Sequence, residues 1–152
     1  MNIYTIVIAL HNIVRWFVLI LGIIAFIKAF AGWIRKRPWG QSDRKISTFY
    51  TIAIDIQLLL GLALFLFFSP NTARAFQDFS GIMGNETARF YVLEHTIMMI
   101  LAVVFVHLGS ALTKKDIPDN LKFRRAAILF GLALVAIVLG MPWDRPLIPG
   151  LG

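Results

Sequence analysis

The chain alternates long apolar runs with short polar connections. Four runs stand out, at residues 3–33, 46–68, 90–112 and about 122–141. A helix that crosses a bilayer needs about 20 mainly apolar residues, and a segment in lipid must satisfy its own backbone hydrogen bonds. Each run is therefore expected to be a membrane-spanning helix. Together they predict an all-α protein, an integral membrane four-helix bundle of up-and-down topology in which residues 1–152 form one domain.

Composition strengthens this prediction and excludes several kinds of site. Hydrophobic residues make up 59% of the 152 residues and charged residues 15%, whereas a soluble domain carries roughly 25% charged residues. The absence of cysteine excludes disulfides, thiolate metal sites, iron–sulfur clusters and covalently attached haem. The first run begins at Ile3 without a preceding basic segment and is longer than a signal-peptide core, so we expect it to be the first membrane helix.

The net charge of +7 is concentrated in two of the connections. The first and third connections contain Arg35, Lys36, Arg37, Arg44 and Lys45, and Lys114, Lys115, Lys122, Arg124 and Arg125. The other side has only Arg74, Arg89 and Arg145. Basic connections usually lie in the cytoplasm, so both termini are expected outside, which is the periplasm in a bacterium. This placement indicates a multi-pass inner-membrane protein that contacts lipid headgroups, and no nucleic-acid partner is expected.

The second connection, residues 69–89, is comparatively long. Residues 72–79 are expected to form a short interfacial helix, and the turn-rich residues that follow connect it to the third run. The segment is either an ordinary connector or a lid over a site. The tail after Gly140 contains three prolines, which exclude a helix, and we expect it to fold over the external ends of the bundle.

Two histidines fall at one depth. His11 lies eight residues after Ile3, about 12 Å from the external end of its run, and His95 lies five residues after Phe90, about 8 Å from the same side. In an up-and-down bundle the first and third helices are diagonal neighbours, so the two side chains can meet at its centre. Gly61 is at a similar depth, where it either leaves room for a flat ligand or serves helix packing.

This arrangement suits one haem b, held without covalent attachment. Neutral imidazoles from His11 and His95 would be the axial ligands of its iron, giving a six-coordinate electron carrier. The competing interpretation is a metal centre without porphyrin, in which Glu94 and Asp55 join the histidines around iron, zinc or copper. Met98 and Met99 are also possible axial ligands, although packing is their commoner role.

The remaining polar residues in the runs allow several roles. Arg15 lies one turn after His11, and a buried arginine needs an anion, so we expect an Arg15–Asp55 ion pair. Alternatively Arg15 holds a haem propionate or a quinone carbonyl. His107 lies about 18 Å deeper than His95 and at a depth where Asp55 can hydrogen-bond it. Asp55, Gln57, Glu94 and His107 thus form either a structural polar cluster or a group that handles protons or quinone.

The motifs span all four runs. They are His11-Asn12-x-x-Arg15-Trp16, Asp55-x-Gln57-Leu58-x-x-Gly61, Glu94-His95 with Met98-Met99 and later His107-x-Gly109, and Gly140-Met141-Pro142-Trp143-x-Arg145-Pro146-Leu147. With these motifs the chain resembles a family of small bacterial four-helix membrane proteins described as cytochrome b-like. The resemblance implies a haem-binding role. Respiratory cytochrome b is similar in architecture only, because it has paired histidines on both ligand helices, and at most one haem is implied here.

The sequence favours a b-type haem-binding electron-transfer protein with one bis-histidine haem. We expect it to act as a carrier or complex subunit rather than a stand-alone enzyme, beside other membrane or periplasmic redox subunits, and a homo-oligomer is possible. One alternative is a haem-free accessory subunit of a larger membrane complex. The other is a membrane enzyme that handles quinone or protons through Arg15, Asp55 and His107, for which ionisable residues within the membrane are suited. No catalytic residue is assigned.

Overall fold

The computed structural model describes residues 2–144 and is helical throughout, without a strand in that range. Its elements are α1 (Ile3–Arg35), α2 (Gln41–Ala63), η1 (Leu64–Phe68), α3 (Pro70–Gln77), α4 (Phe79–Gly84), α5 (Glu86–Arg89), η2 (Phe90–Glu94), α6 (His95–Thr113) and α7 (Asp119–Gly140). Four continuous helical segments are long and apolar enough to cross a membrane, namely Ile3–Arg35, Gln41–Phe68, Glu86–Thr113 and Asp119–Gly140. The prediction of an all-α membrane bundle with four spans is confirmed.

Three spans begin earlier than their apolar runs suggest. Helix α2 starts at Gln41 rather than near residue 46, the third span at Glu86 rather than 90, and α7 at Asp119 rather than 122. In each case a polar first turn continues the helix beyond the apolar stretch. Asp43, Glu86 and Asp119 lie in these first turns, where a carboxylate is favoured by the helix dipole.

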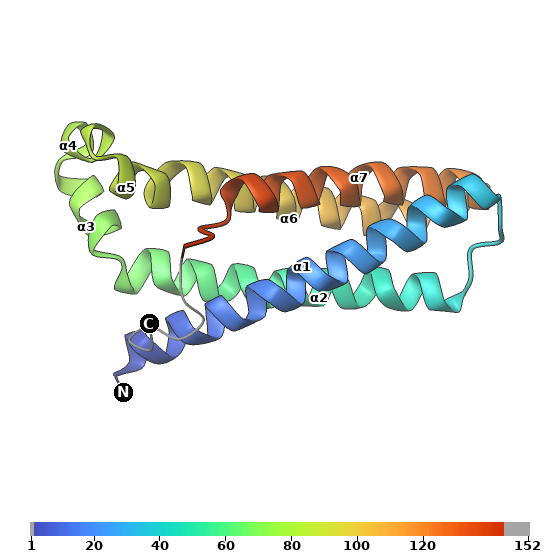
Figure 1. The fold of residues 1–152 in the computed structure, drawn as a ribbon, viewed down its shortest axis with the longest axis horizontal. Helices are drawn as coiled ribbons and strands as arrows, with labels where there is room; N and C mark the ends of the chain where they lie inside the picture. The colour runs from blue at the N-terminus through green and yellow to red at the C-terminus, as the bar shows by residue number, and fades with distance from the viewer. Residues whose placement is uncertain (1, 145–152) are drawn as a thin grey trace.

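The four long helices run side by side along the length of the molecule (Figure 1). Helix α1 packs on α2 and α7, and α6 packs on α7 and, less extensively, on α2. This order places α1 and α6 on one diagonal and α2 and α7 on the other. We call the end that carries α3–α5 and the start of α1 the histidine end. The opposite end, with the connections at residues 36–40 and 114–118, is the basic end (Figure 1).

Aromatic side chains fill the core towards the basic end. Phe123 and Phe130 are almost fully buried, and each lies against a glycine of a neighbouring helix. A Cβ at Gly109 would lie 2.7 Å from Cε1 of Phe130, and a Cβ at Gly32 would overlap the Phe123 ring. Because these positions have no side chain, the helices approach closely, as membrane helices with small interface residues do.

The histidine end is packed more loosely. The buried residues of α2 are Asp43, Ser47, Tyr50 and Ile54, and none from residue 55 to its end is buried. The turns η1 and η2 contain no buried residue, and the first buried residue of α6 is Ala102. Helices α2 and α6 therefore leave their facing surfaces poorly covered at the level of His11 and His95.

Candidate cofactor site

His11 and His95 face each other across the α1–α6 diagonal. Their ring centres are 6.4 Å apart and their ring planes are inclined by 71°. Both side chains are partly buried, near the histidine end. The two positions that share a depth in the sequence are thus neighbours in space, although they come from helices that are not adjacent in the bundle.

The carbonyl group of Gly140 orients His95. Nδ1 of His95 lies 2.7 Å from the Gly140 oxygen, one of the carbonyls that the end of α7 leaves without a helical partner. A carbonyl can only accept, so Nδ1 carries the proton and Nε2 of the neutral ring keeps its lone pair. Gly140 makes this approach possible, because a Cβ there would lie 2.5 Å from Cβ of Met98. Met98 and Met99 pack against this glycine.

Gln57 of α2 holds His11. Its Nε2 donates to the His11 carbonyl oxygen at 3.0 Å and lies 3.2 Å from Nε2 of the His11 ring. An amide nitrogen has two hydrogens and can make both contacts. Nδ1 of His11 is buried and has no hydrogen-bond partner in the described part of the chain. A Cβ at Gly61 would lie 3.3 Å from Cε1 of His11, so the absence of a side chain at this position lets the His11 ring pack closely against α2.

The helices change pitch next to the site. η1 and η2 are single π-helical turns, and η2 immediately precedes His95. Such widened turns occur frequently at functional sites. η2 also brings the rings of Phe90 and Tyr91 to within 6.1 and 6.3 Å of the His95 ring centre, so aromatic groups form one wall of the site.

Arg15 does not form the expected ion pair with Asp55. It is buried, and its Nη1 donates to the carbonyl oxygen of Pro142 at 3.0 Å. Its guanidinium carbon lies 5.7 Å from the centre of the Trp16 ring, and Trp16 meets Trp143 edge-on. Arg15 therefore fastens the segment after α7 to α1. Residues 141–144 run from the end of α7 towards α1, whereas the rest of the proline-rich tail lies outside the described residues (Figure 1).

Asp55 instead pairs with His107. Oδ1 of Asp55 lies 3.2 Å from Nε2 of His107, and Nδ1 of His107 lies 3.0 Å from the Val103 carbonyl oxygen. The two side chains are 45% and 46% exposed, although both lie well inside apolar spans. The pair bridges α2 and α6 on a surface that α1 and α7 do not cover.

Glu94 pairs with Arg89 and makes no hydrogen bond to His11 or His95 among the described residues. Its Oε1 accepts from Nε of Arg89 at 2.7 Å, a contact within the third span. Within residues 2–144, no three His, Cys, Asp or Glu side chains gather as ligands of one metal ion. The alternative of a metal centre built from His11, His95, Glu94 and Asp55 is wrong for this reason.

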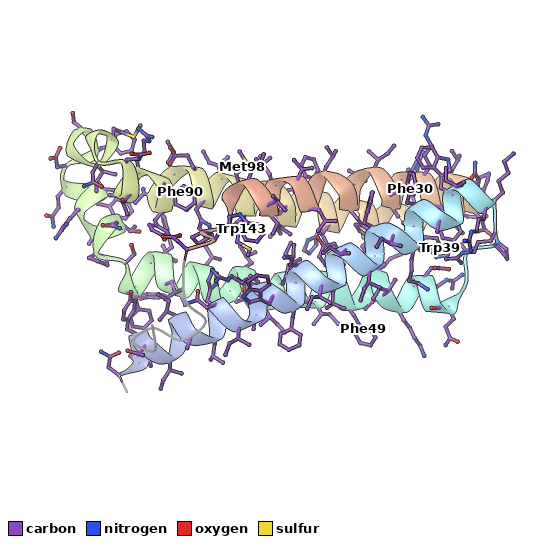
Figure 2. All side chains as sticks on the ribbon, in the orientation of Figure 1. Phe30, Trp39, Phe49, Phe90, Met98 and Trp143 are labelled. Carbon is purple, nitrogen blue, oxygen red and sulfur yellow. The ribbon has the colours of Figure 1, made fainter. Side chains whose placement is uncertain are left out.

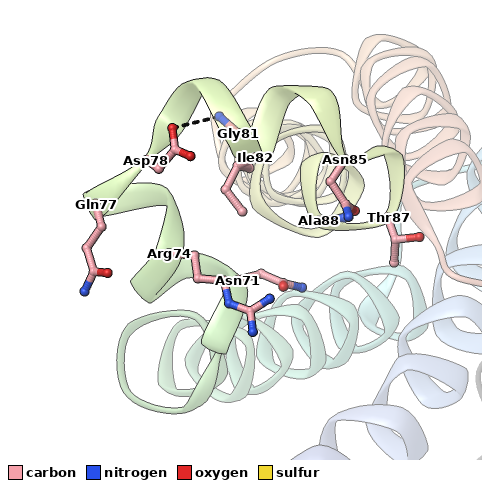
Figure 3. Close-up of a pocket in the computed structure, with 9 residues that line it drawn as sticks. All are labelled: Asn71, Arg74, Gln77, Asp78, Gly81, Ile82, Asn85, Thr87 and Ala88. Atoms are coloured by element: carbon pink, nitrogen blue, oxygen red, sulfur yellow. Dashed lines mark hydrogen bonds between the residues drawn. The ribbon is translucent and has the colours of Figure 1, made fainter.

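The second connection holds a cavity of about 530 Å³ between its short helices (Figure 3). Its polar groups already serve the backbone, since Asp78 accepts from the Gly81 N–H and Asn85 from the Ala88 N–H. Most of the lining is exposed, and Arg74 reaches across it. The expected interfacial helix is α3, which ends at Gln77, before Phe79. The cavity is a surface hollow lined mainly by exposed polar residues, unsuited to an apolar cofactor.

Three contacts at the site were not expected from the sequence. They are the Gly140 carbonyl on His95, the Gln57 amide on His11 and the aromatic wall of Phe90 and Tyr91. The sequence contains an indication of the Gln57 contact, because Gln57 lies one helical turn before Gly61, at the depth of His11. A backbone carbonyl leaves no such signal in a sequence.

Comparison of the chain with family models, with curated proteins and with solved structures finds no match. The resemblance to cytochrome b-like membrane proteins therefore stays a prediction.

Proposed function

We propose that the protein binds one haem b between α1 and α6, with His11 and His95 as axial ligands, and acts as a membrane electron carrier or electron-transfer subunit. The observation that carries this proposal is the histidine pair across the diagonal. Two imidazoles that share a metal ion through bonds of about 2 Å place their ring centres roughly 6 Å apart, and the observed separation is 6.4 Å.

The ligand atoms support the same assignment. Nδ1–H of His95 donates to the Gly140 carbonyl oxygen, the kind of contact that commonly fixes a metal-binding histidine and leaves Nε2 for the metal. Because the Gln57 amide donates to Nε2 of His11, the Nδ1 of that ring, which has no partner among the described residues, carries the proton, and His11 would bind iron once its ring turns or Gln57 releases Nε2. Two ligands suffice for haem because the porphyrin supplies the other four.

The surroundings also fit a flat apolar group. Gly61 places no side chain against the His11 ring, and no residue of α2 from 55 to its end is fully buried. Arg15, one turn from His11, supplies a positive charge that suits a carboxylate such as a haem propionate. When bound, haem supplies one-electron oxidation and reduction. The chain would orient it through His95 and Gly140, and exclude water with Phe90 and Tyr91.

A reduced-minus-oxidised spectrum of the purified protein tests the proposal. We expect a b-type α-band with one haem per chain, lost in His11→Ala and in His95→Ala. His107→Ala is the matched control, since His107 lies on the same helix as His95 but pairs with Asp55, and its spectrum should be unchanged. A folded protein that stays colourless after expression with ample haem would refute haem binding and favour an accessory subunit.

A second candidate function, quinone or proton handling, is favoured by the Asp55–His107 pair. Ionisable groups exposed within a membrane are costly and usually functional. This pair offers one acceptor and one titratable donor to a lipid-soluble headgroup between α2 and α6. Asp55→Asn should then abolish quinone-dependent reduction of the haem while leaving the α-band intact. Unchanged reduction by quinol in this variant would exclude the role.

We further propose the bacterial inner membrane as the location, with the basic end in the cytoplasm and the termini in the periplasm. The basic connections support this orientation. The histidine pair then lies nearer the periplasm, which suits a redox partner on that side. Cysteine introduced at Ser80 in the second connection should react with a membrane-impermeant reagent in intact spheroplasts, and labelling only after lysis would reverse the orientation.

A further inference from the structure

A polar cavity of about 310 Å³ lies at the basic end, between α2, α6 and α7. Three of its lining residues are cationic, namely Arg44, Lys114 and Lys122, and no Asp or Glu lines it. The cavity is at the opposite end of the bundle from His11 and His95 and takes no part in the haem proposal.

The acid that precedes Arg44 in the sequence is engaged elsewhere. Asp43 is buried and accepts two hydrogen bonds from Arg37, at 2.6 and 2.7 Å, which raise the pKa of the Arg37 guanidinium. Arg44 and Lys114 form no ion pair within residues 2–144. Lys122 forms an ion pair at 3.4 Å with Asp119, which lies three residues earlier on the same helix. Two of the three cations of the cavity, Arg44 and Lys114, therefore have no ion-pair partner among the described residues.

Hydroxyl groups complete the lining. They belong to Ser47 and Thr48 of α2 and to Ser110 and Thr113 of α6. Thr113 already donates to the Ser110 carbonyl oxygen at 2.8 Å. Ser47 is different, because it is only 3% exposed and its Oγ has no hydrogen-bond partner among the described residues. A buried hydroxyl without a partner is unfavourable, and here it lies on the wall of a cationic cavity.

We infer that this cavity binds the phosphate group of an anionic lipid. Phosphate oxygens accept hydrogen bonds from hydroxyls and from cations together, and basic pockets between membrane helices on the cytoplasmic side suit anionic headgroups. A lipid fits better than free phosphate because the same helices continue into exposed apolar surface, at Ile52 of α2 and Leu108 of α6. That surface can hold acyl chains while Ser47, Arg44 and Lys114 hold the headgroup.

Native mass spectrometry of the full-length protein in neutral detergent tests this site, with phosphatidylglycerol, phosphatidylcholine and inorganic phosphate as probes. Phosphatidylglycerol should bind more tightly than phosphatidylcholine. Arg44→Ala and Lys114→Ala should each weaken it about tenfold, as expected for a lost charged hydrogen bond. Lys45→Ala is the matched control, since Lys45 is the exposed neighbour of Arg44 and does not line the cavity, and it should cost only a few-fold at most.

Ser47→Ala separates binding from a merely structural role. It should weaken phosphatidylglycerol binding, yet raise the unfolding temperature of the lipid-free protein, because it removes a buried unpaired hydroxyl. Equal binding of both lipids, or equal losses in Arg44→Ala and Lys45→Ala, would overturn the site. If inorganic phosphate bound with the same dependence on these variants and phosphatidylglycerol did not, the lipid assignment would be overturned.

Discussion

The two ends of the bundle are stabilised in different ways. At the basic end, Phe123 and Phe130 are buried against glycines, and Asp43 is held by Arg37. At the histidine end, polar contacts replace packing, with His95 on the Gly140 carbonyl and Gln57 on His11. The side chains of Figure 2 show aromatic residues at both ends, but the fully buried rings of the described residues, Tyr50, Phe123 and Phe130, lie between the middle of the bundle and the basic end.

This difference indicates that the basic end mainly stabilises the fold, whereas the histidine end contains the candidate functional site. A closely packed end can keep four helices together while the other end leaves groups incompletely satisfied, such as Nδ1 of His11. Functional sites commonly contain such unfavourable groups, and the stability of the rest of the fold offsets their free-energy cost. The histidine end has the poorly covered helix faces and the π-helical turns, so we expect substitutions there to change binding more than stability.

Phe123→Ala should have the largest effect on stability. Phe123 is fully buried, meets Trp39 edge-on with ring centres 4.7 Å apart, and lies against Gly32. Its loss should lower the free energy of unfolding by about 3–5 kcal/mol, measured by denaturant titration in detergent. Phe30→Ala is the control, because Phe30 is 45% exposed, and it should cost under about 1 kcal/mol. Similar losses for both would show that the basic end is not the packed core.

Gly140→Ala should combine a moderate loss of stability with a loss of site geometry. The new Cβ would lie 2.5 Å from Cβ of Met98, an atom that cannot move without its helix, so α6 and α7 must separate. We expect a cost of about 1–3 kcal/mol and a weakened His95–Gly140 contact, seen as reduced haem content. Gly84→Ala is the control, since a Cβ there meets nothing within 4 Å. Full haem content in Gly140→Ala would contradict the positioning role of Gly140.

Gly61→Ala should change stability and binding in opposite directions. Alanine favours helix by about 1 kcal/mol relative to glycine, and its methyl group would lie 3.3 Å from Cε1 of His11, which a small shift of the ring accommodates. The haem-free protein should therefore be slightly more stable, while haem occupancy falls because the methyl group displaces the His11 ring from its position. Thermal unfolding and haem content measured on one preparation decide the matter, and a stabilised variant with full haem content would assign Gly61 to helix packing alone.

The sequence predicts depth along a helix better than direction around it. Apolar length located the four spans, and counting along them placed His11 beside His95. The same counting predicted that Arg15 could reach Asp55. In the structure Arg15 donates to the Pro142 carbonyl oxygen, whereas Asp55 of α2 pairs with His107 of α6. Three spans begin earlier than predicted because their polar first turns are also helical. The His95–Gly140 contact could not be predicted from the sequence, because its acceptor is a backbone carbonyl that is available only where α7 ends.

The smallest effect should come from the ion pair of the histidine end. Arg89 and Glu94 are 2.7 Å apart and their side chains are 38% and 40% exposed, so the ion pair is partly solvated even though Oε2 of Glu94 is buried. Glu94→Gln should cost less than about 1 kcal/mol, and salt should reduce this cost further. Asp43→Asn is the comparison at the basic end, because the Asp43 side chain is only 3% exposed and its loss leaves Arg37 unpaired. It should cost about 1.5–3 kcal/mol. If denaturant titrations gave Glu94→Gln the larger cost, the Arg89–Glu94 pair would be structurally required beside His95, and the histidine end would not be the tolerant half of the bundle.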